Sequence, residues 1–541
     1  MPLQEWYKMG TKSKKYWLTF LALSVFSGFL IRFIFLLHIP VIETDGVFYA
    51  TLGKKLVSPH PWQGIDAYWP PFYPVLIGLF SFIFKDLEFS GRMVSAIMGS
   101  ILIIPAFFLI REVFSEKVAR LSVILMIFHP RLVISSQQVL TESTYTFLIV
   151  TGIFTALIAF KKSKAWLFLL VGFIFGLSYL TRPEGFFIYF LMAMWVLFFP
   201  GLFLKNSQAK NKKNLILLTF SLGFLIFALP YLFFVRKELG YWTISEKSSY
   251  NFYTTFRSEY QKYGLAPANL QTSHQESKEI AIESDKVNYR PFSFALHHPW
   301  IVGKRVMKNI LRIIFDRIPS SLTYNFVLVL LFGIFLKRKE IPYKKEEIFL
   351  CSFVILAILQ YSLFSVQNRF FTFLIPLLIA WTVVGLFEWE RIIGRKWGNY
   401  VFLFLVLPSI FYFFYKSITK KYDLEHKEAG IWLKNNAEKS SVVMSRKPYA
   451  AFYSGNLIAS IPEDSYEGVT IYARKRKADY LVIDERYIPT RRAELKFLLN
   501  PSPVPKELEM VYQGEYEGKR IVIYKWLQEN LPFASGKGGR L

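Results

Sequence analysis

Two carboxylates follow the first hydrophobic run of the chain at short spacing. Glu43 and Asp45 lie in the polar stretch after this run, and the rigid pair Pro70-Pro71 follows further on. Carboxylates at a water–lipid boundary can act as acids, bases or metal ligands when a reaction uses a substrate held in the membrane. The pair is therefore the first candidate site, and the segments around it must show where it lies.

The composition is that of a membrane protein. Of 541 residues, 53% are hydrophobic, 18% are aromatic and only 19% are charged, which is too apolar for a soluble enzyme of this size. A helix needs about 20 apolar residues to span a bilayer. About eleven segments approach this length, namely 17–38, 91–111, 119–137, 142–160, 165–181, 184–204, 214–235, 320–336, 346–366, 369–389 and 399–415. The sequence therefore predicts an α-helical polytopic membrane protein.

The apolar run Pro71–Phe84 is too short to count as a further span. It begins with prolines, which favours an interfacial or re-entrant helix in the first outer loop. If it does not cross, every short loop rich in lysine and arginine lies on one side of the membrane, as the positive-inside rule requires. The net charge of +26 then reflects topology and anchoring, and no patch or motif supports nucleic-acid binding.

This topology divides the chain into two domains. Residues 1–415 form a transmembrane domain with outer loops at 39–90 and 236–319, and residues 416–541 form a soluble domain on the outer side. Within the second loop, residues 303–318 have an apolar face and a cationic face, which is typical of a helix lying in the membrane interface.

The soluble domain has a mixed pattern. It starts with a helical stretch and continues with strand-like runs at 441–445, 478–484 and 519–525. This pattern predicts a small α/β domain. A disulfide framework is not expected, because Cys351 is the single cysteine of the chain and lies in a predicted helix.

Six short motifs follow one another along the predicted outer side. They are D-x-x-x-Y-A at 45–50, Pro-Pro-Phe-Tyr-Pro at 70–74, Thr-Glu at 141–142, Leu-Thr-Arg-Pro-Glu-Gly at 180–185, His-Pro at 298–299 and Asn-Arg-Phe at 368–370. In these motifs the chain resembles the C-type membrane glycosyltransferases of glycosyltransferase family 39, which include the dolichyl-phosphate-mannose protein mannosyltransferases and the bacterial aminoarabinose transferases. One departure is Gly46, which stands where the family frequently has a second acid.

The resemblance implies an inverting glycosyl transfer on the outer side of the membrane. A polyprenyl-phosphate sugar would be the donor, an acceptor hydroxyl would attack the anomeric carbon, and the lipid phosphate would leave. Asp45, at the acidic position of the family, is the expected general base. Arg182 and Arg369 are the expected phosphate contacts, because a guanidinium is permanently charged and matches phosphate oxygens in pairs.

Several further residues of these regions have an expected role in the reaction and also a simpler structural explanation. Glu142 is expected to share in catalysis or to cap the fourth span, and Asp45 with Thr44 can also cap a helix that begins at Gly46. Arg182 can pair with Glu184 instead of substrate. The expected substrate contacts are Glu43, Tyr49, Tyr73, Arg182, Glu184, Lys304, Arg305 and Arg369. Lys304 and Arg305 can also bind lipid head groups in general.

Metal dependence, acceptor and location stay open to different degrees. The histidines show no metal-ligand spacing, and a divalent cation held by Glu43, Asp45 and the donor phosphate is left as an alternative. The acceptor is a lipid, a glycan or a protein. The resemblance implies the inner membrane of a bacterium.

A transporter or flippase of lipid-linked sugars is the alternative function, but we find no internal repeat that such a protein would show.

Overall fold

The computed structural model is mostly helical and divides into two compact units, each described by itself. It describes residues 11–199, 213–262, 291–336, 338, 344–364, 366–419, 421–462 and 464–527. Within these ranges, unit 1 comprises Met1–Ile39, Phe48–Thr255 and Arg290–Lys420, and unit 2 comprises Pro40–Val47, Phe256–Tyr289 and Lys421–Leu541. The middle of the predicted outer loop 236–319 lies outside the described residues.

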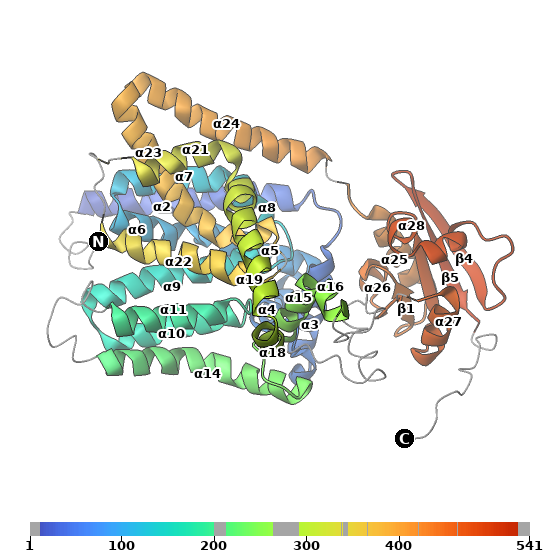
Figure 1. The fold of residues 1–541 in the computed structure, drawn as a ribbon. Coiled ribbons are helices and arrows are strands. Elements are labelled where there is room, and N and C mark those ends of the chain that lie inside the picture. The colour runs from blue at the N-terminus through green and yellow to red at the C-terminus, as the bar shows by residue number, and fades with distance from the viewer. Residues whose placement is uncertain are drawn as a thin grey trace. The chain divides into compact units, whose positions relative to one another are not determined.

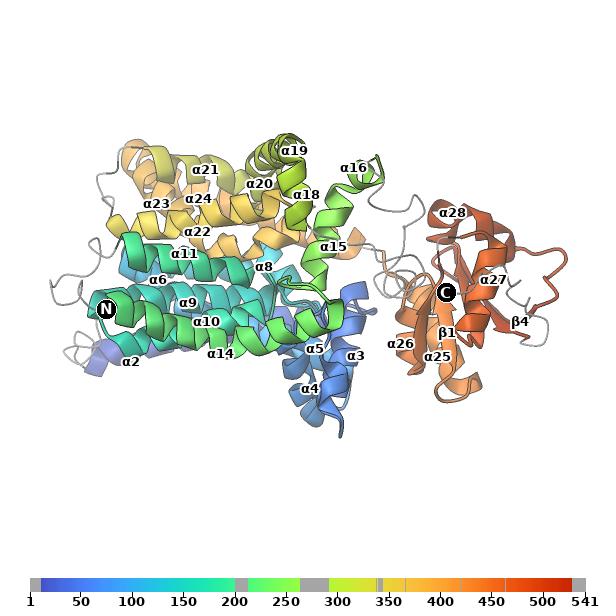
Figure 2. The same ribbon diagram turned by 60° about the horizontal axis from the view of Figure 1, so that its bottom comes forward.

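Unit 1 is a bundle of helices, in which α9, α10, α11 and α14 lie side by side (Figures 1 and 2). The helices up to residue 198 are α2 (Thr11–Leu36), α3 (Thr44–Leu56, which begins in unit 2), η1 (Pro61–Gly64), α4 (Phe72–Phe84), α5 (Leu87–Ile101), α6 (Ile103–Val113), α7 (Glu116–Phe128), α8 (Pro130–Ser135), α9 (Glu142–Lys162), α10 (Ala165–Tyr179) and α11 (Gly185–Phe198). The later ones are α14 (Lys213–Leu239), α15 (Glu246–Thr255), α18 (Pro291–His297), α19 (Pro299–Arg312), η2 (Ile313–Arg317), α20 (Ile318–Leu322), α21 (Tyr324–Phe335), α22 (Lys345–Ser362), η3 (Asn368–Leu374), α23 (Ile375–Ile393) and α24 (Arg395–Thr419).

Several of these helices are suited to a bilayer. Among the described residues, five are long and apolar enough to span one, namely Tyr16–Leu36, Leu87–Val113, Glu142–Lys162, Lys213–Leu239 and Asn368–Ile393. Each coincides with a predicted span. Other predicted spans are shorter helices, such as α10 and α11. The structure is therefore helical and contains several apolar helices. The count of about eleven membrane spans stays a prediction.

Two predicted spans are broken, and both breaks have a local cause. The predicted span 119–137 divides at His129, which is extended (φ −66°, ψ 119°) because it precedes Pro130. The predicted span 320–336 begins only at α21, after a bend of 112° at Thr323, whose φ is 73°. The run Pro71–Phe84 forms α4, whose 13 residues reach about 20 Å, less than the thickness of a bilayer core.

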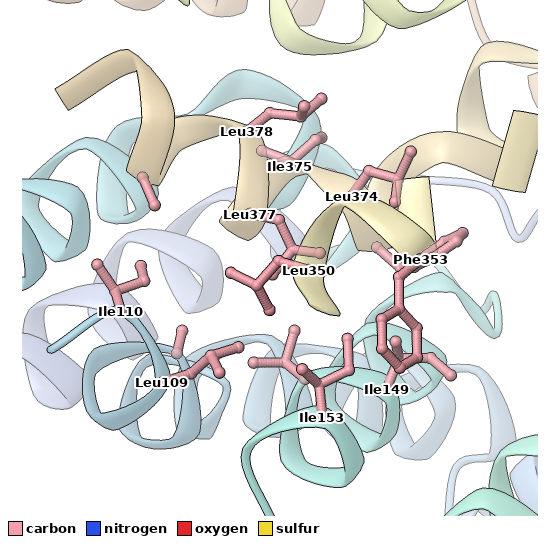
Figure 3. Close-up of a cluster of buried hydrophobic side chains, with 14 of the residues drawn as sticks. Leu109, Ile110, Ile149, Ile153, Leu350, Phe353, Leu374, Ile375, Leu377 and Leu378 are labelled. Atoms are coloured by element: carbon pink, nitrogen blue, oxygen red, sulfur yellow. The ribbon is translucent and has the colours of Figure 1, made fainter. Parts of the chain in front are cut away.

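The core of unit 1 is continuous and apolar. Figure 3 shows side chains that face one another from five segments, with Leu109 and Ile110 on α6, Ile149 and Ile153 on α9, Leu350 and Phe353 on α22, Leu374 on η3, and Ile375, Leu377 and Leu378 on α23. Lipid tails are as apolar as these side chains, so helices in a bilayer associate through close packing. The fit between helices is therefore the main determinant of this arrangement.

Two glycines show how close the packing is where α21 crosses α23. A Cβ on Gly333 would lie 1.9 Å from Trp381 O, and one on Gly385 would lie 2.0 Å from Val329 O. Small residues at a crossing let two helix backbones touch. Neither position has room for any side chain.

Unit 2 contains a five-stranded mixed sheet with the order β2-β1-β3-β5-β4. β1 pairs in parallel with β2 and β3, and β5 is antiparallel to β3 and β4. The elements are α16 (Arg257–Lys262), α25 (Leu424–Asn436), β1 (Val442–Ser445), α26 (Tyr449–Ser454), β2 (Leu457–Ser460), α27 (Tyr466–Lys475), β3 (Tyr480–Asp484), α28 (Ile488–Arg491), η4 (Ala493–Leu499), β4 (Leu508–Tyr516) and β5 (Lys519–Trp526). The three predicted strand runs correspond to β1, β3 and β5.

The sheet of unit 2 is covered on both faces. Val443 and Val482 pack with residues of α25 and α26, whereas Met444 and Leu481 pack with residues of α27 and η4. Alternate residues of a strand point to opposite faces, so both faces of β1 and β3 are apolar. The end of the predicted soluble domain, from residue 528 on, lies outside the described residues.

The glycine crossing leads to a first prediction. Gly333→Ala should lower the free energy of unfolding by about 1–3 kcal/mol, because the new methyl group forces α21 and α23 apart. Gly303→Ala is the matched control, since a Cβ there meets nothing within 4 Å. Thermal unfolding in detergent measures both. Equal melting temperatures for the two variants would contradict the close crossing.

Candidate active site

Arg182 is the centre of a buried ionic cluster in unit 1. Its Nη1 donates to Glu142 Oε1 and its Nη2 donates to Glu184 Oε1, both at 3.2 Å. The guanidinium also lies over the rings of Tyr145 and Phe370, at 5.6 and 5.1 Å. Arg182 and Glu142 are only 8% and 4% exposed. Charges buried to this extent are very unfavourable unless they are paired. The surrounding helices therefore have to keep the paired groups within hydrogen-bond distance.

The turn that carries Arg182 connects α10 to α11 and is fixed on both sides. Arg182 N donates to Ser178 O, and Phe72 N donates to Leu180 O, both at 2.9 Å. Gly185 begins α11 directly after the turn, and a Cβ there would lie 2.6 Å from the backbone N of Tyr179. The contact of Phe72 joins the Pro-Pro motif to the Leu-Thr-Arg-Pro-Glu-Gly motif, so these two motifs form one structural element.

Two more arginines approach Glu142 from other segments. Arg369 Nε lies 3.7 Å from Glu142 Oε1, and the adjacent Asn368 accepts a hydrogen bond from Arg317 Nη1 at 2.9 Å. Arg131, at the start of α8, is close enough for the charges of Glu142 and Arg369 to act on it. Arg182 and Arg369 therefore pair with Glu142, and Arg131 lies within electrostatic range of the same carboxylate. The surplus of positive charge favours an anionic ligand.

Several buried polar atoms of the cluster have no hydrogen-bond partner in the part of the chain that the structure describes. They are Glu142 Oε2, Tyr145 OH, Arg182 Nε, Glu184 Oε2 and Tyr361 OH. Buried polar atoms rarely lack a partner, and each such case requires an explanation. The set contains both donors and acceptors. It fits a ligand that offers acceptor oxygens together with hydroxyl donors.

A small cavity is lined by two of these five residues, Glu184 and Tyr361. It measures about 10 Å³, and Glu184, Lys247, Tyr361 and Phe370 are among the residues that line it. This volume holds about one water molecule. A sugar ring can therefore enter only if the surrounding side chains move.

The opposite charges of Arg182 and Glu184 shift the pKa of each group toward its charged form. Burial alone would lower the pKa of Arg182, but the carboxylates of Glu184 and Glu142 outweigh it and raise this pKa well above its ordinary value. Burial would raise the pKa of Glu184, but the Arg182 guanidinium outweighs it and holds this pKa below its usual range, with a smaller contribution from Lys247. The pairing of the two groups therefore favours the charged form of each.

An aromatic wall with a cation lies beside the cluster. Lys247 Nζ, on α15, lies 4.0 Å from the ring centre of Trp69 and 5.4 Å from that of Tyr68. The predicted substrate contacts Tyr49 and Tyr73 are both buried behind Trp69, with ring centres 4.8 Å apart for Tyr49 and Trp69. Tyr73 OH shares a hydrogen bond with Ser95 Oγ at 2.8 Å. These contacts give Tyr73 a packing role.

Lys304 and Arg305 do not join this cluster through any contact of the described residues. Lys304 is exposed on α19, and Arg305 Nη2 donates to Thr255 O at 2.8 Å. Their roles in binding substrate or lipid head groups stay predictions.

Asp45 and Glu43 belong to the segment Pro40–Val47 of unit 2. α3 begins at Thr44 and not at Gly46, so Asp45 lies in the first turn of the helix and is not its N-cap. In the described ranges, no group of three or more histidine, cysteine or carboxylate side chains gathers in a way that could hold a metal ion. The alternative of a divalent cation held by Glu43, Asp45 and the donor phosphate stays a prediction.

Four residues of the cluster were not predicted from the sequence. Tyr145 follows Glu142 by three positions, a spacing that puts both on one helix face, so a signal for it was present. Arg131, Lys247 and Tyr361 have no comparable local pattern. They reach the site only through the tertiary fold.

Part of the sequence matches a known family. Residues 69–234 match the family model of dolichyl-phosphate-mannose-protein mannosyltransferase, and this segment includes the Pro-Pro motif, Glu142 and Arg182. No curated protein sequence matches the chain.

Solved structures share the fold. The oligosaccharyltransferase of Archaeoglobus fulgidus in its apo form has a TM-score of 0.58 at 14% identity, covering 88% of this chain and 70% of that chain. The same archaeal protein, AglB, in complex with an inhibitory peptide and a dolichol-phosphate has a TM-score of 0.56 at 15% identity, covering 87% and 70%. ArnT from Cupriavidus metallidurans, bound to undecaprenyl phosphate, has a TM-score of 0.53 at 11% identity, covering 94% and 98%.

At such identities these structures show a shared fold, and the family match adds the sequence pattern of residues 69–234. Together with the apolar helices, they indicate an integral membrane protein. The resemblance predicted from the motifs, to the membrane glycosyltransferases that use polyprenyl-linked donors, is thereby confirmed.

Proposed function

We propose that this protein transfers a sugar from a polyprenyl-phosphate donor to an acceptor hydroxyl, with inversion at the anomeric carbon. The observation that carries the proposal is the buried cluster around Arg182, which combines surplus positive charge with unpartnered donors and acceptors. A phosphate supplies the oxygens that guanidinium groups bind, and a sugar supplies hydroxyls for the carboxylates. Two solved structures of the same fold hold a dolichol-phosphate and undecaprenyl phosphate, which supports this donor class.

Arg182 and Arg369 hold the donor phosphate in this proposal. Their positive charge stabilises the polyprenyl phosphate as the bond between its oxygen and the anomeric carbon breaks. Glu142 Oε1 is shared by both guanidinium groups, at 3.2 and 3.7 Å, so its role is to orient them. Glu184 fixes Arg182 from the other side and is available for a sugar hydroxyl through Oε2.

Asp45 is the general base in this proposal. It takes the proton of the acceptor hydroxyl while the hydroxyl oxygen forms the new bond to the anomeric carbon. Its support is its place in the acidic motif of the first outer loop, directly after the first span. We place the reaction on the outer side of the membrane, as the charge pattern of the loops favours. The family resemblance implies that this membrane is the inner membrane of a bacterium.

The role of Asp45 gives the second prediction. Asp45→Asn should lower kcat at least about 100-fold while donor binding persists, because the proton acceptor is lost and the phosphate contacts remain. Release of polyprenyl phosphate from purified protein in lipid vesicles, given donor and acceptor, measures the turnover. Glu509→Gln, at an exposed carboxylate on β4, is the control and should retain full activity. Full activity of Asp45→Asn would refute this base, and donor movement without phosphate release would favour a flippase.

The unpartnered hydroxyls give the third prediction. Tyr361→Phe should raise the free energy of unfolding of the unliganded protein by about 1 kcal/mol, because it removes a buried hydroxyl that has no partner among the described residues, and should raise the donor KM about tenfold. Tyr179→Phe is the matched control, since Tyr179 OH donates to Ile244 O at 2.7 Å. It should lower the free energy of unfolding by about 1 kcal/mol without affecting donor binding. The reverse pattern would remove Tyr361 from the donor site.

A further inference from the structure

The segment before α3 is bonded to the C-terminal part of unit 2. Lys427 Nζ donates to Pro40 O at 2.6 Å, and Ile42 N donates to Tyr453 OH at 2.8 Å. Thr44 Oγ1 shares a hydrogen bond of 2.8 Å with Tyr449 OH. These contacts connect residues about 400 positions apart in the sequence, and they hold the chain immediately before Asp45.

Two of these residues, Tyr449 and Tyr453, come after the carboxyl end of the inner strand β1. β1 ends at Ser445, Lys447 follows two residues later, and Tyr449 and Tyr453 are one helical turn apart on α26. β1 lies between β2 and β3, so the connections on its two sides run in opposite directions. The carboxyl ends of strands at such a switch point are where α/β folds bind their ligands. Here residues that follow the carboxyl end of β1 bind a segment of the same chain.

Lys447 adds a charge to these contacts. Its Nζ lies 3.3 Å from Thr44 Oγ1 and 4.8 Å from the ring centre of Tyr487. Burial and the positive charge of Arg446 lower the pKa of Lys447, while the negative charges of Asp423, Asp45 and Asp484 act in the opposite direction. Lys447 is therefore placed on Thr44 and within electrostatic range of Asp45.

The two side chains that contact Thr44, those of Lys447 and Tyr449, are themselves held by other residues of unit 2. The ring of Tyr449 lies 5.7 Å from that of His426, which is fully buried on α25. The ring of Tyr487 is held at its hydroxyl, which lies 3.0 Å from both carboxylate oxygens of Asp423. Contacts on both sides limit the rotamers of Lys447 and Tyr449, so their hydrogen bonds to Thr44 have a defined direction.

We propose that the C-terminal domain positions the base: Lys447 and Tyr449 hold Thr44 and thereby orient the carboxylate of Asp45 at the start of α3. This inference rests on the proposed function, in which Asp45 takes the acceptor proton. Lys447 and Tyr449 are positioning residues and do not contact the reacting atoms. They consequently affect the rate of transfer and not the binding of the donor.

The first arm of the test is kinetic, with the full-length protein. Tyr449→Phe removes one hydrogen bond to Thr44 and should lower kcat about five- to tenfold with the donor KM unchanged within twofold. Lys447→Met should lower kcat further and shift the acidic limb of the pH–rate profile, and Lys447→Arg should restore part of the rate. Tyr512→Phe is the control, because Tyr512 OH bonds only Tyr516 OH, at 3.1 Å, among the contacts described. Unchanged kcat in Tyr449→Phe and Lys447→Met would overturn the proposal.

The second arm needs no catalysis. Hydrogen exchange of the peptide that covers residues 40–47 should be slow in the native protein and at least about tenfold faster in Tyr453→Phe, which loses the acceptor of Ile42 N–H. Equal exchange in both proteins would overturn the proposal even if the enzyme is active. A native protein that protects this peptide but releases no polyprenyl phosphate would instead refute the function proposed above. The two failures are thus distinguished.

Discussion

The pairing of Arg182 with two buried carboxylates is the interaction on which the candidate site depends. In so apolar an interior, an isolated guanidinium or carboxylate would be strongly destabilising, so each member of the cluster requires the others. Glu142 begins α9, and Glu184 ends the turn between α10 and α11. Their pairing with Arg182 therefore brings the ends of three helices together. Replacing a buried ionic network with apolar side chains is often neutral or stabilising, so stability alone does not account for these charges.

The same cluster is preorganised but incomplete without a ligand. A buried donor or acceptor without a partner destabilises the folded state by roughly 1–3 kcal/mol. The hydroxyls of Tyr145 and Tyr361 and the Nε of Arg182 are in this position within the described chain. A ligand that bonds these atoms recovers that free energy on binding. Donors held in place before the reaction are also the arrangement that stabilises a leaving phosphate most effectively, because they need no reorganisation as its charge develops.

The sequence predicted the helices and strands better than the tertiary contacts between them. Hydrophobic length located helices such as Glu142–Lys162 and Lys213–Leu239, because burial in lipid requires long apolar runs. The break at His129-Pro130 follows from backbone chemistry and could have been predicted, unlike the bend at Thr323, a residue that rarely adopts a positive φ. The motifs led to Arg182, Glu184 and Glu142. The assignment of Pro40–Val47 to unit 2 depends on contacts with side chains about 400 residues later, which no local pattern reveals.

The two kinds of carboxylate in this protein have different surroundings, and this difference separates their roles. Glu142 shares one oxygen between two guanidinium groups, so it is committed to holding cations in place. Asp45 lies in a segment, Pro40–Val47, that contains no lysine or arginine, and Lys447 of the C-terminal part of unit 2 is within electrostatic range of it. Groups of one chemical type can serve as base and as structural counter-ion when their environments differ in this way. In the proposed function, proton uptake by Asp45 leaves the cluster intact, whereas proton uptake by Glu142 would weaken the pairing that holds Arg182 and Arg369.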